Sequence, residues 1–187
     1  MIKISSSTEE ELSKYLLRRS NDIYLFSNVF SEDMCNKLVE FTNKNAKNRL
    51  VVGEGQNVQA YEGEIFSDDP FFKPISSKLI DIGRFLACKY HITFGNYNEY
   101  NHEGITIRKI YGPTQLHADG PTYDMVNGNM MVSVDQIRSV SVIIALNGDY
   151  DGGEIVFPCQ NFKTKLKQGE AIAFPPYWTH PHYTEDL

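Results

Sequence analysis

The sequence of 187 residues lacks several features that would assign a function by themselves. Its three cysteines, Cys35, Cys88 and Cys159, are widely spaced and form no C-x-x-C pair, which argues against a zinc knuckle or a redox dithiol. No HExxH, GxSxG or P-loop sequence occurs, so metalloprotease, serine-hydrolase and nucleotide-binding functions have no support. No apolar run of about 18 residues exists, and no membrane span is expected.

A strong charge of one sign is also missing. The formal net charge is -6, which argues against a general binder of nucleic acid or anionic membranes. The first twenty residues contain no apolar core of the kind found in secretion signals, and the cysteines are odd in number. A reducing, cytoplasmic location is therefore expected. The length suits a single domain, 1–187, and nothing in the sequence indicates an oligomeric state.

Helical patterns occupy the first half of the chain and strand patterns the second. Helices are expected at 7–19, from Ser31 onward and at about 72–91, with β-forming residues at 21–30 and an irregular stretch at 50–68. Short β-rich runs separated by turn signals predict strands at 105–112, 139–147, 153–158, 162–167 and 169–175. This order indicates a mainly β fold with N-terminal helices: helical support over 1–92 and a sandwich or jelly-roll core over 93–187.

A long connection, residues 120–137, separates two of the expected strands. Long connections beside a site often form a lid or a substrate-binding loop. A surface hairpin without a role in binding is an equally good interpretation.

The first residues that suggest chemistry are His117 and Asp119, two apart after a β-like run. In an extended segment this spacing places both side chains on one side. His180 and His182 follow another expected strand far downstream. Two imidazoles and one carboxylate on one face of a metal leave the opposite positions free, as in non-haem iron(II) oxygenases. Because His180 and His182 lie two residues apart, their side chains would point to the same side of an extended segment. Periodicity therefore cannot choose between them as the third ligand.

Three sequence stretches together resemble a known family. They are the run Tyr111-Gly112-Pro113 followed by His117 and Asp119, the segment SVSVIIALNGDYDGGEIVFP at 139–158, and GEAIAFPPYWTHPH at 169–182. These stretches resemble the iron(II)/2-oxoglutarate dioxygenases of the prolyl 4-hydroxylase-like branch. The N-terminal YLFSNVFSEDMCNKLVEF resembles the lead-in strand and helix of that family.

The resemblance implies a double-stranded β-helix, that is, a cupin-like jelly roll buttressed by helices. It implies iron(II) bound by His117, Asp119 and His182, with His180 as the alternative distal ligand. It also implies 2-oxoglutarate as co-substrate, dioxygen as oxidant and ascorbate as a further candidate ligand. Tyr111 matches a position that contacts the far carboxylate of 2-oxoglutarate, and Lys109 shares its face at a spacing of two.

The sequence departs from the family pattern at its end. The family places a basic residue for the far carboxylate on a final strand, whereas this sequence stops at Leu187, so that strand is missing from the expected core. Which group holds the far carboxylate is therefore open.

The resemblance favours hydroxylation of a prolyl residue in a protein or peptide, with release of succinate and carbon dioxide. A small-molecule substrate is the alternative, and no nucleic-acid or membrane partner is expected. Two other functions compete. One is a non-catalytic cupin-like binding module, and the other is a zinc-dependent hydrolase that uses the same three ligands.

Overall fold

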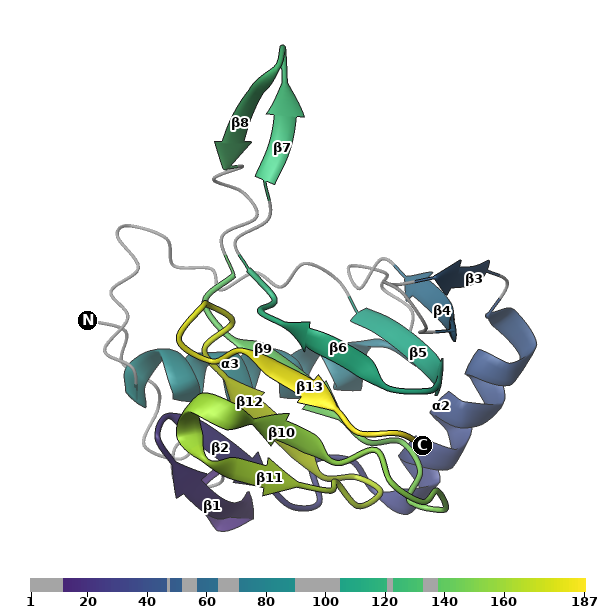
Figure 1. Cartoon of the computed structure of the whole chain (residues 1–187). Coiled ribbons are helices and arrows are strands. Elements are labelled where there is room, and N and C mark those ends of the chain that lie inside the picture. Colours follow the sequence, from purple (N-terminus) through teal and green to yellow (C-terminus); the bar gives the residue numbers. More distant parts are fainter. Residues whose placement is uncertain are drawn as a thin grey trace.

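Two antiparallel sheets of four strands form the body of the protein. The computed structural model describes residues 12–46, 48–51, 57–63, 71–89, 105–120, 123–132 and 138–187 (Figure 1). The first sheet has the order β1-β2-β12-β9 and the second the order β11-β10-β13-β6. After β9 the chain passes to the second sheet for β10 and β11, returns for β12, and passes back for β13. This alternation is a double-stranded β-helix, so the predicted fold class is confirmed.

The strands of both sheets are short. Five strand predictions in the second half each correspond to an observed strand, because the alternating runs and turn residues there are local signals. Four of the five are β9, β10, β11 and β12 of the two main sheets, and the fifth is β5 (Ile105–Tyr111) of a separate sheet. The strands of the two main sheets are β1 (Leu16–Ser20), β2 (Ile23–Phe26), β6 (Thr114–His117), β9 (Ser141–Ile144), β10 (Ile155–Phe157), β11 (Phe162–Thr164), β12 (Ala171–Phe174) and β13 (His182–Thr184).

The N-terminal region differs from the prediction. Helix is present at 12–15, but residues 16–20 form β1, which pairs with β2 in a hairpin. Asn21 and Asp22 both have positive φ, 47° and 64°, as a tight two-residue hairpin turn requires. β2 also pairs with β12, so this hairpin is part of the jelly roll itself rather than of a helical support. The helix prediction for 16–19 was wrong because a local pattern cannot reveal pairing with a distant strand.

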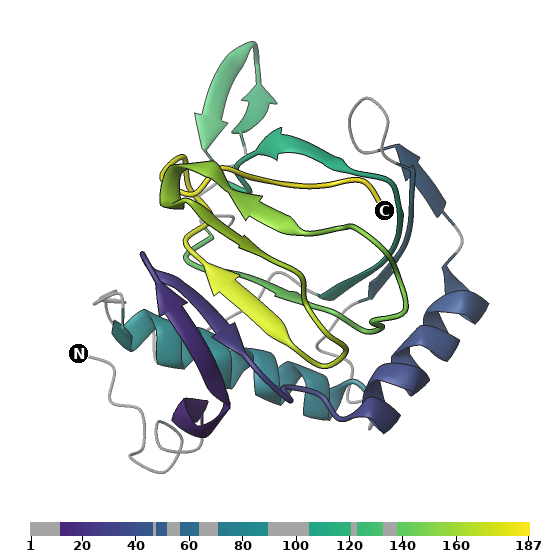
Figure 2. The ribbon, with the colours of Figure 1, turned by 60° about the horizontal axis from the view of Figure 1, so that its bottom comes forward.

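Two helices cover the outer side of the first sheet (Figure 2). α2 (Glu32–Asn45) begins after Ser31, whose hydroxyl accepts a hydrogen bond from the Met34 amide at 3.3 Å. α3 (Lys73–Lys89) lies within the predicted range of 72–91. Apolar residues of both helices meet the outward face of the first sheet in one core cluster, which includes Cys35, Leu38, Ile75, Ile82, Phe85, Leu86, Tyr24, Phe26, Ala171 and Ala173.

A second core fills the space between the two sheets. Ile172 and Phe174 of β12 belong to it, whereas their neighbours Ala171 and Ala173 face the helices, as alternation along a strand requires. Phe157 of β10 lies in this inner core and has no exposed surface. The inner core consists of Ile23, Ile155, Phe157, Phe162, Leu166, Ile172 and Phe174.

A third sheet has the order β3-β4-β5. β3 (Asn48–Val51) and β4 (Asn57–Gly63) occupy much of the stretch that was expected to be irregular, and β4 pairs along its whole length with β5. The prediction was wrong here because glycines are typical of irregular chain, and β4 becomes a strand by pairing with β5, which lies far along the chain. The division at residue 92 was also too simple, since strands occur on both sides of it.

The connection at 120–137 contains a hairpin that extends from the body (Figure 1). β7 (Tyr123–Val126) and β8 (Asn129–Val132) are joined by Asn127 and Gly128, both with positive φ. This segment is therefore a hairpin, and its form alone does not decide between a substrate-binding role and none.

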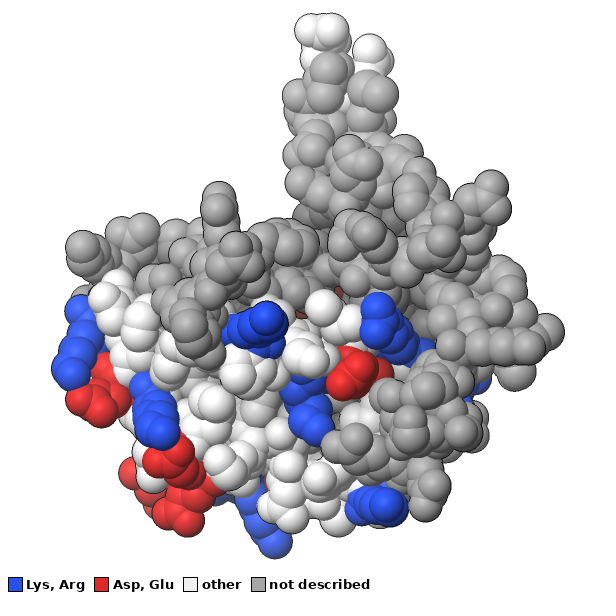
Figure 3. All heavy atoms as spheres, turned by 180° about the vertical axis from the view of Figure 1, so that it is seen from behind, with Lys and Arg blue, Asp and Glu red and all other residues white. Residues whose placement is uncertain are grey.

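Acidic and basic side chains are interspersed on the face seen from behind in Figure 3.

No helix in the described ranges has both the length and the apolar character needed to cross a membrane.

Candidate metal centre

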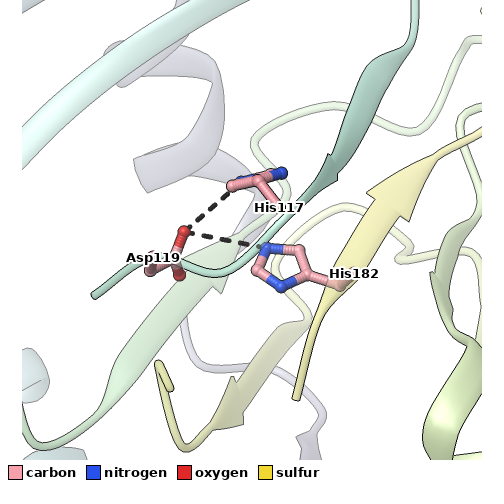
Figure 4. Close-up of side chains that lie close together, drawn as sticks. All are labelled: His117, Asp119 and His182. Atoms are coloured by element: carbon pink, nitrogen blue, oxygen red, sulfur yellow. Dashed lines mark ion pairs between the residues drawn. The ribbon is translucent and has the colours of Figure 1, made fainter. Parts of the chain in front are cut away.

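Three predicted ligands converge at one end of the second sheet. His117 is the last residue of β6 and His182 the first of β13, and the two are directly paired across these antiparallel strands. Asp119 lies two residues beyond β6. Nε2 of His117 is 3.4 Å from Oδ1 of Asp119, and Nε2 of His182 is 3.7 Å from the same oxygen (Figure 4). One donor atom from each residue lies within 4.8 Å of the others, close enough to share one metal ion.

Backbone carbonyl groups fix the orientation of both imidazoles. Nδ1 of His117 is 2.7 Å from the Gln115 carbonyl oxygen, and Nδ1 of His182 is 3.2 Å from that of His180. Because a carbonyl can only accept, each Nδ1 carries a hydrogen in these contacts, and each Nε2 has a lone pair whenever the ring is neutral. Both lone pairs belong to the nitrogens nearest the Asp119 carboxylate. This arrangement is typical of metal-binding histidines, whose second nitrogen donates to a carbonyl or carboxylate.

Asp119 is held by contacts that leave one oxygen available. Ser141 on β9 donates its hydroxyl hydrogen to Oδ2 at 2.5 Å, and the Arg138 guanidinium donates to the Asp119 backbone carbonyl at 2.6 Å. Oδ1 is the oxygen that the two histidines approach. Ser141 was not among the residues predicted from the sequence. Its place on an expected strand, two residues from other inward-facing side chains, was the available signal.

His180 occupies a different environment from His182. Its ring is buried, Nε2 donates to the Asn21 carbonyl at 2.9 Å, and Nδ1 lies 2.9 Å from the Thr179 hydroxyl. Both nitrogens are therefore engaged with the N-terminal hairpin turn and with the neighbouring residue. The structure brings His182, not His180, to the group with His117 and Asp119.

The structure does not bring Lys109 and Tyr111 to this group. Nζ of Lys109 donates to the Asn43 side chain on α2 at 3.2 Å and lies 5.6 Å from the centre of the Tyr111 ring. Ile107, on the same face of β5, is buried in the core under the helices. The face of β5 with these three residues therefore looks toward α2. The expectation that Lys109 and Tyr111 hold a co-substrate gains no support from this placement.

The donor set fits a catalytic metal better than a structural one. Two imidazole nitrogens and one carboxylate oxygen from one side leave the remaining positions for exchangeable ligands. A structural zinc site would use four protein ligands, commonly with sulfur, and no cysteine joins this group among the described residues. The His182 side chain is almost fully buried, whereas that of His117 is 40% exposed, so the site is open on the His117 side.

Comparison with known proteins shows what this chain is similar to in sequence and in fold. No family model matches the sequence. A protein of Acanthamoeba polyphaga mimivirus named "Putative prolyl 4-hydroxylase" is 23% identical over 161 residues, which cover 83% of this chain and 61% of that protein. The chain thus spans less than two thirds of this relative.

Solved structures of prolyl hydroxylases share the fold. A viral collagen prolyl hydroxylase from Paramecium bursaria Chlorella virus-1, solved with 2-oxoglutarate, has a TM-score of 0.59 and 20% identity, over 89% of this chain and 90% of the other. A Pseudomonas putida prolyl-4-hydroxylase gives 0.60 and 12%, over 97% and 90%. A Trichoplax adhaerens prolyl hydroxylase in complex with a hypoxia inducible factor peptide fragment gives 0.61 and 16%, over 96% and 85%.

This chain resembles the prolyl 4-hydroxylases. The resemblance noted from its sequence motifs is thereby confirmed. In this prolyl 4-hydroxylase-like chain, His117 and Asp119 of one motif and His182 of the other lie together at one end of the jelly roll.

Hydrogen bonds and burial shift the pKa values of the three groups in different directions. The hydrogen bond with Asp119 raises the pKa of His117 despite partial burial. Burial lowers the pKa of His182, and this effect exceeds the attraction of Asp119. Burial by itself would raise the pKa of Asp119, but hydrogen bonds from His117 and Ser141 outweigh it and lower the pKa. The metal-free centre therefore keeps an ionised carboxylate beside a histidine that holds its proton to higher pH than usual.

Metal affinity is expected to fall as the pH drops through the raised pKa of His117. Above this pKa both imidazoles are neutral and binding releases no proton; below it the metal must displace one proton from His117, so affinity falls by about tenfold per pH unit. Calorimetry of manganese(II) binding in buffers of different ionisation enthalpy measures the protons released. Affinity that is constant with pH across this range would contradict the expectation.

Ser141→Ala is expected to weaken metal binding by roughly 10- to 100-fold without unfolding the protein, because an outer hydrogen-bond partner fixes the ligand carboxylate. Manganese(II) titration measures the change. Ser139→Ala is the matched control, since no described residue bonds to the Ser139 side chain. Equal affinities for the two variants would show that Ser141 does not orient Asp119.

Proposed function

We propose that this chain is an iron(II)- and 2-oxoglutarate-dependent dioxygenase that hydroxylates a C–H bond in a prolyl residue of a protein or peptide. The convergence of His117, Asp119 and His182 on a jelly-roll fold carries this proposal. The resemblance to prolyl hydroxylases supports it, including one neighbour solved with 2-oxoglutarate and one solved with a peptide.

The chain's residues provide binding and orientation for this reaction. Nε2 of His117, Nε2 of His182 and Oδ1 of Asp119 would hold iron(II) from one side. When bound, iron(II) couples oxidative decarboxylation of 2-oxoglutarate to hydroxylation, so one dioxygen supplies one oxygen atom to succinate and one to the product alcohol, with release of carbon dioxide. Ser141 and the carbonyl groups of Gln115 and His180 hold the three ligands in their binding orientation.

Aromatic packing keeps water from one side of the centre. The His182 ring lies 4.7 Å from the Phe174 ring and 5.3 Å from the Phe157 ring, measured between centroids. These buried rings fix the imidazole plane and exclude water behind it. Substrates therefore have to approach from the His117 side, where the side chain is 40% exposed.

An exposed aromatic side chain in the segment that leads to His182 supports a peptidyl-proline substrate. Trp178 is 81% exposed in the segment between β12 and β13, which meets the ligand loop through a hydrogen bond from the Gly120 amide to the Pro176 carbonyl at 2.9 Å. Proline-rich segments dock on exposed aromatic rings because their extended conformation is already formed. An exposed tryptophan at this place supplies such a surface.

The proposal is tested by incubating the protein with iron(II), 2-oxoglutarate, ascorbate and a panel of proline-containing peptides, and measuring succinate and the gain of one oxygen atom by mass spectrometry. Hydroxylated peptide with an equal amount of succinate is expected. Metal analysis of protein purified without oxygen is the companion measurement. Bound zinc together with peptide hydrolysis would instead establish the hydrolase, and a failure to bind 2-oxoglutarate would favour a non-catalytic module.

A further inference from the structure

The two faces of β5 look in different directions. Ile107 is 5% exposed and packs in the core under the helices, and Lys109 donates to Asn43 on α2. Because side chains alternate along a strand, Arg108 and Ile110 lie on the opposite face of β5 from these two residues. The face with Arg108 therefore looks away from α2.

The Arg108 face lies toward the metal centre. β5 is joined to β6 through only Gly112 and Pro113, and β6 ends at His117 (Figure 1). The centre lies on the side of the strands turned away from the helices, because Ser141 of β9 contacts Asp119 while its neighbour Val142 packs in the core under the helices. The Arg108 side chain is exposed, and no described residue forms an ion pair with it.

Apolar surface accompanies this charge. Ile110, on the Arg108 face of β5, is 42% exposed. Ile143 is 38% exposed and lies at period two from Ser141 on β9, hence on the face that contacts Asp119. Half-exposed isoleucines on strand faces directed toward the site suit a ligand that has both a hydrocarbon part and a charge.

We propose that Arg108 binds the carboxylate of 2-oxoglutarate that lies farthest from the metal. The inference rests on the proposed function. 2-Oxoglutarate occupies the metal with its keto group and near carboxylate, which leaves two methylene groups and a second carboxylate to be held. Ile110 and Ile143 contact the methylene groups, and the planar guanidinium fork matches a carboxylate with two parallel hydrogen bonds. Arg108 takes the role that the sequence suggested for Lys109 and Tyr111.

The test compares two ligands that differ only in that carboxylate. 2-Oxopentanoate carries a methyl group where 2-oxoglutarate has its far carboxylate. Calorimetry without oxygen, with iron(II) present, gives the dissociation constant of each ligand for the wild type, Arg108→Gln, Arg108→Lys and Lys109→Gln. Iron(II) binding to each variant before the ligand is added shows whether the metal centre is intact.

Arg108→Gln is expected to bind 2-oxoglutarate roughly 10- to 100-fold more weakly, as loss of a charge-assisted contact predicts, and to bind 2-oxopentanoate as the wild type does. Arg108→Lys should fall between the two, because the charge stays but the fork is lost. Lys109→Gln is the matched control, since it removes the same charge from the opposite face, and it should bind both ligands as the wild type does.

The outcomes separate this inference from the proposed function. If the wild type prefers 2-oxoglutarate and Arg108→Gln keeps that preference, Arg108 is not the anchor, although the proposed function stands. A larger loss in Lys109→Gln than in Arg108→Gln also overturns the inference. If the wild type binds the two acids equally, the far carboxylate has no anchor and only the inference fails. If the wild type binds neither acid, 2-oxoglutarate dependence and the role of Arg108 fail together.

Discussion

Asp119→Ala is expected to lower metal affinity by more than about 100-fold and to abolish succinate formation. Oδ1 of Asp119 is the single anionic donor of the group, and both histidines approach it. Loss of an outer partner of a metal ligand already weakens binding 10- to 100-fold, so loss of the ligand itself has a larger effect. Two imidazoles alone also provide no negative charge to offset that of the metal.

The measurement is manganese(II) titration together with NMR of the histidine side chains. In the metal-free variant the pKa of His117 should fall, because the Asp119 hydrogen bond is the largest cause of its rise. Asp151→Ala, which removes an exposed carboxylate from the loop after β9, is the control and should leave both quantities unchanged. Wild-type metal affinity in Asp119→Ala would remove the basis for the proposed centre.

Phe157→Ala is expected to destabilise the protein by about 3–5 kcal/mol, the range for truncating a fully buried phenylalanine. The ring has no exposed surface and lies 4.9 Å from Phe174 and 6.2 Å from Phe162 between centroids. Because folded domains are stable by only about 5–15 kcal/mol, this loss is a large share of the total. The cavity would also remove support from His182, whose ring is 5.3 Å from Phe157.

Chemical denaturation of the metal-free protein measures the stability, and metal titration below the unfolding transition measures the second effect. Phe26→Ala is the matched control, since Phe26 is equally buried but lies in the core under the helices. It should lose comparable stability and keep its metal affinity, whereas Phe157→Ala should lose both. A loss of under about 1 kcal/mol for Phe157→Ala would mean that the inner core repacks around the gap.

The second half of the chain was largely predictable because its signals are local. Alternating apolar residues and glycine-containing turns locate β9 to β12 within a few residues. The capping pattern at Ser31 likewise locates the start of α2. Two N-terminal strands were taken as helix and as irregular chain, because Leu16–Ser20 and Asn57–Gly63 become strands by pairing with β2 and β5.

The sequence determined which kinds of atom are available for a metal. Among five histidines, His117 stands two residues from a carboxylate after a strand, and only His180 and His182 follow a strand further on. The tertiary structure decided between these two. His180 gives its Nε2 hydrogen to the Asn21 carbonyl, whereas cross-strand pairing sets His182 opposite His117. The same alternation turned Lys109 toward α2 and left Arg108 on the other face. A residue type and its spacing are properties of the chain, but the direction of a side chain depends on which strand pairs beside it and which layer covers each face.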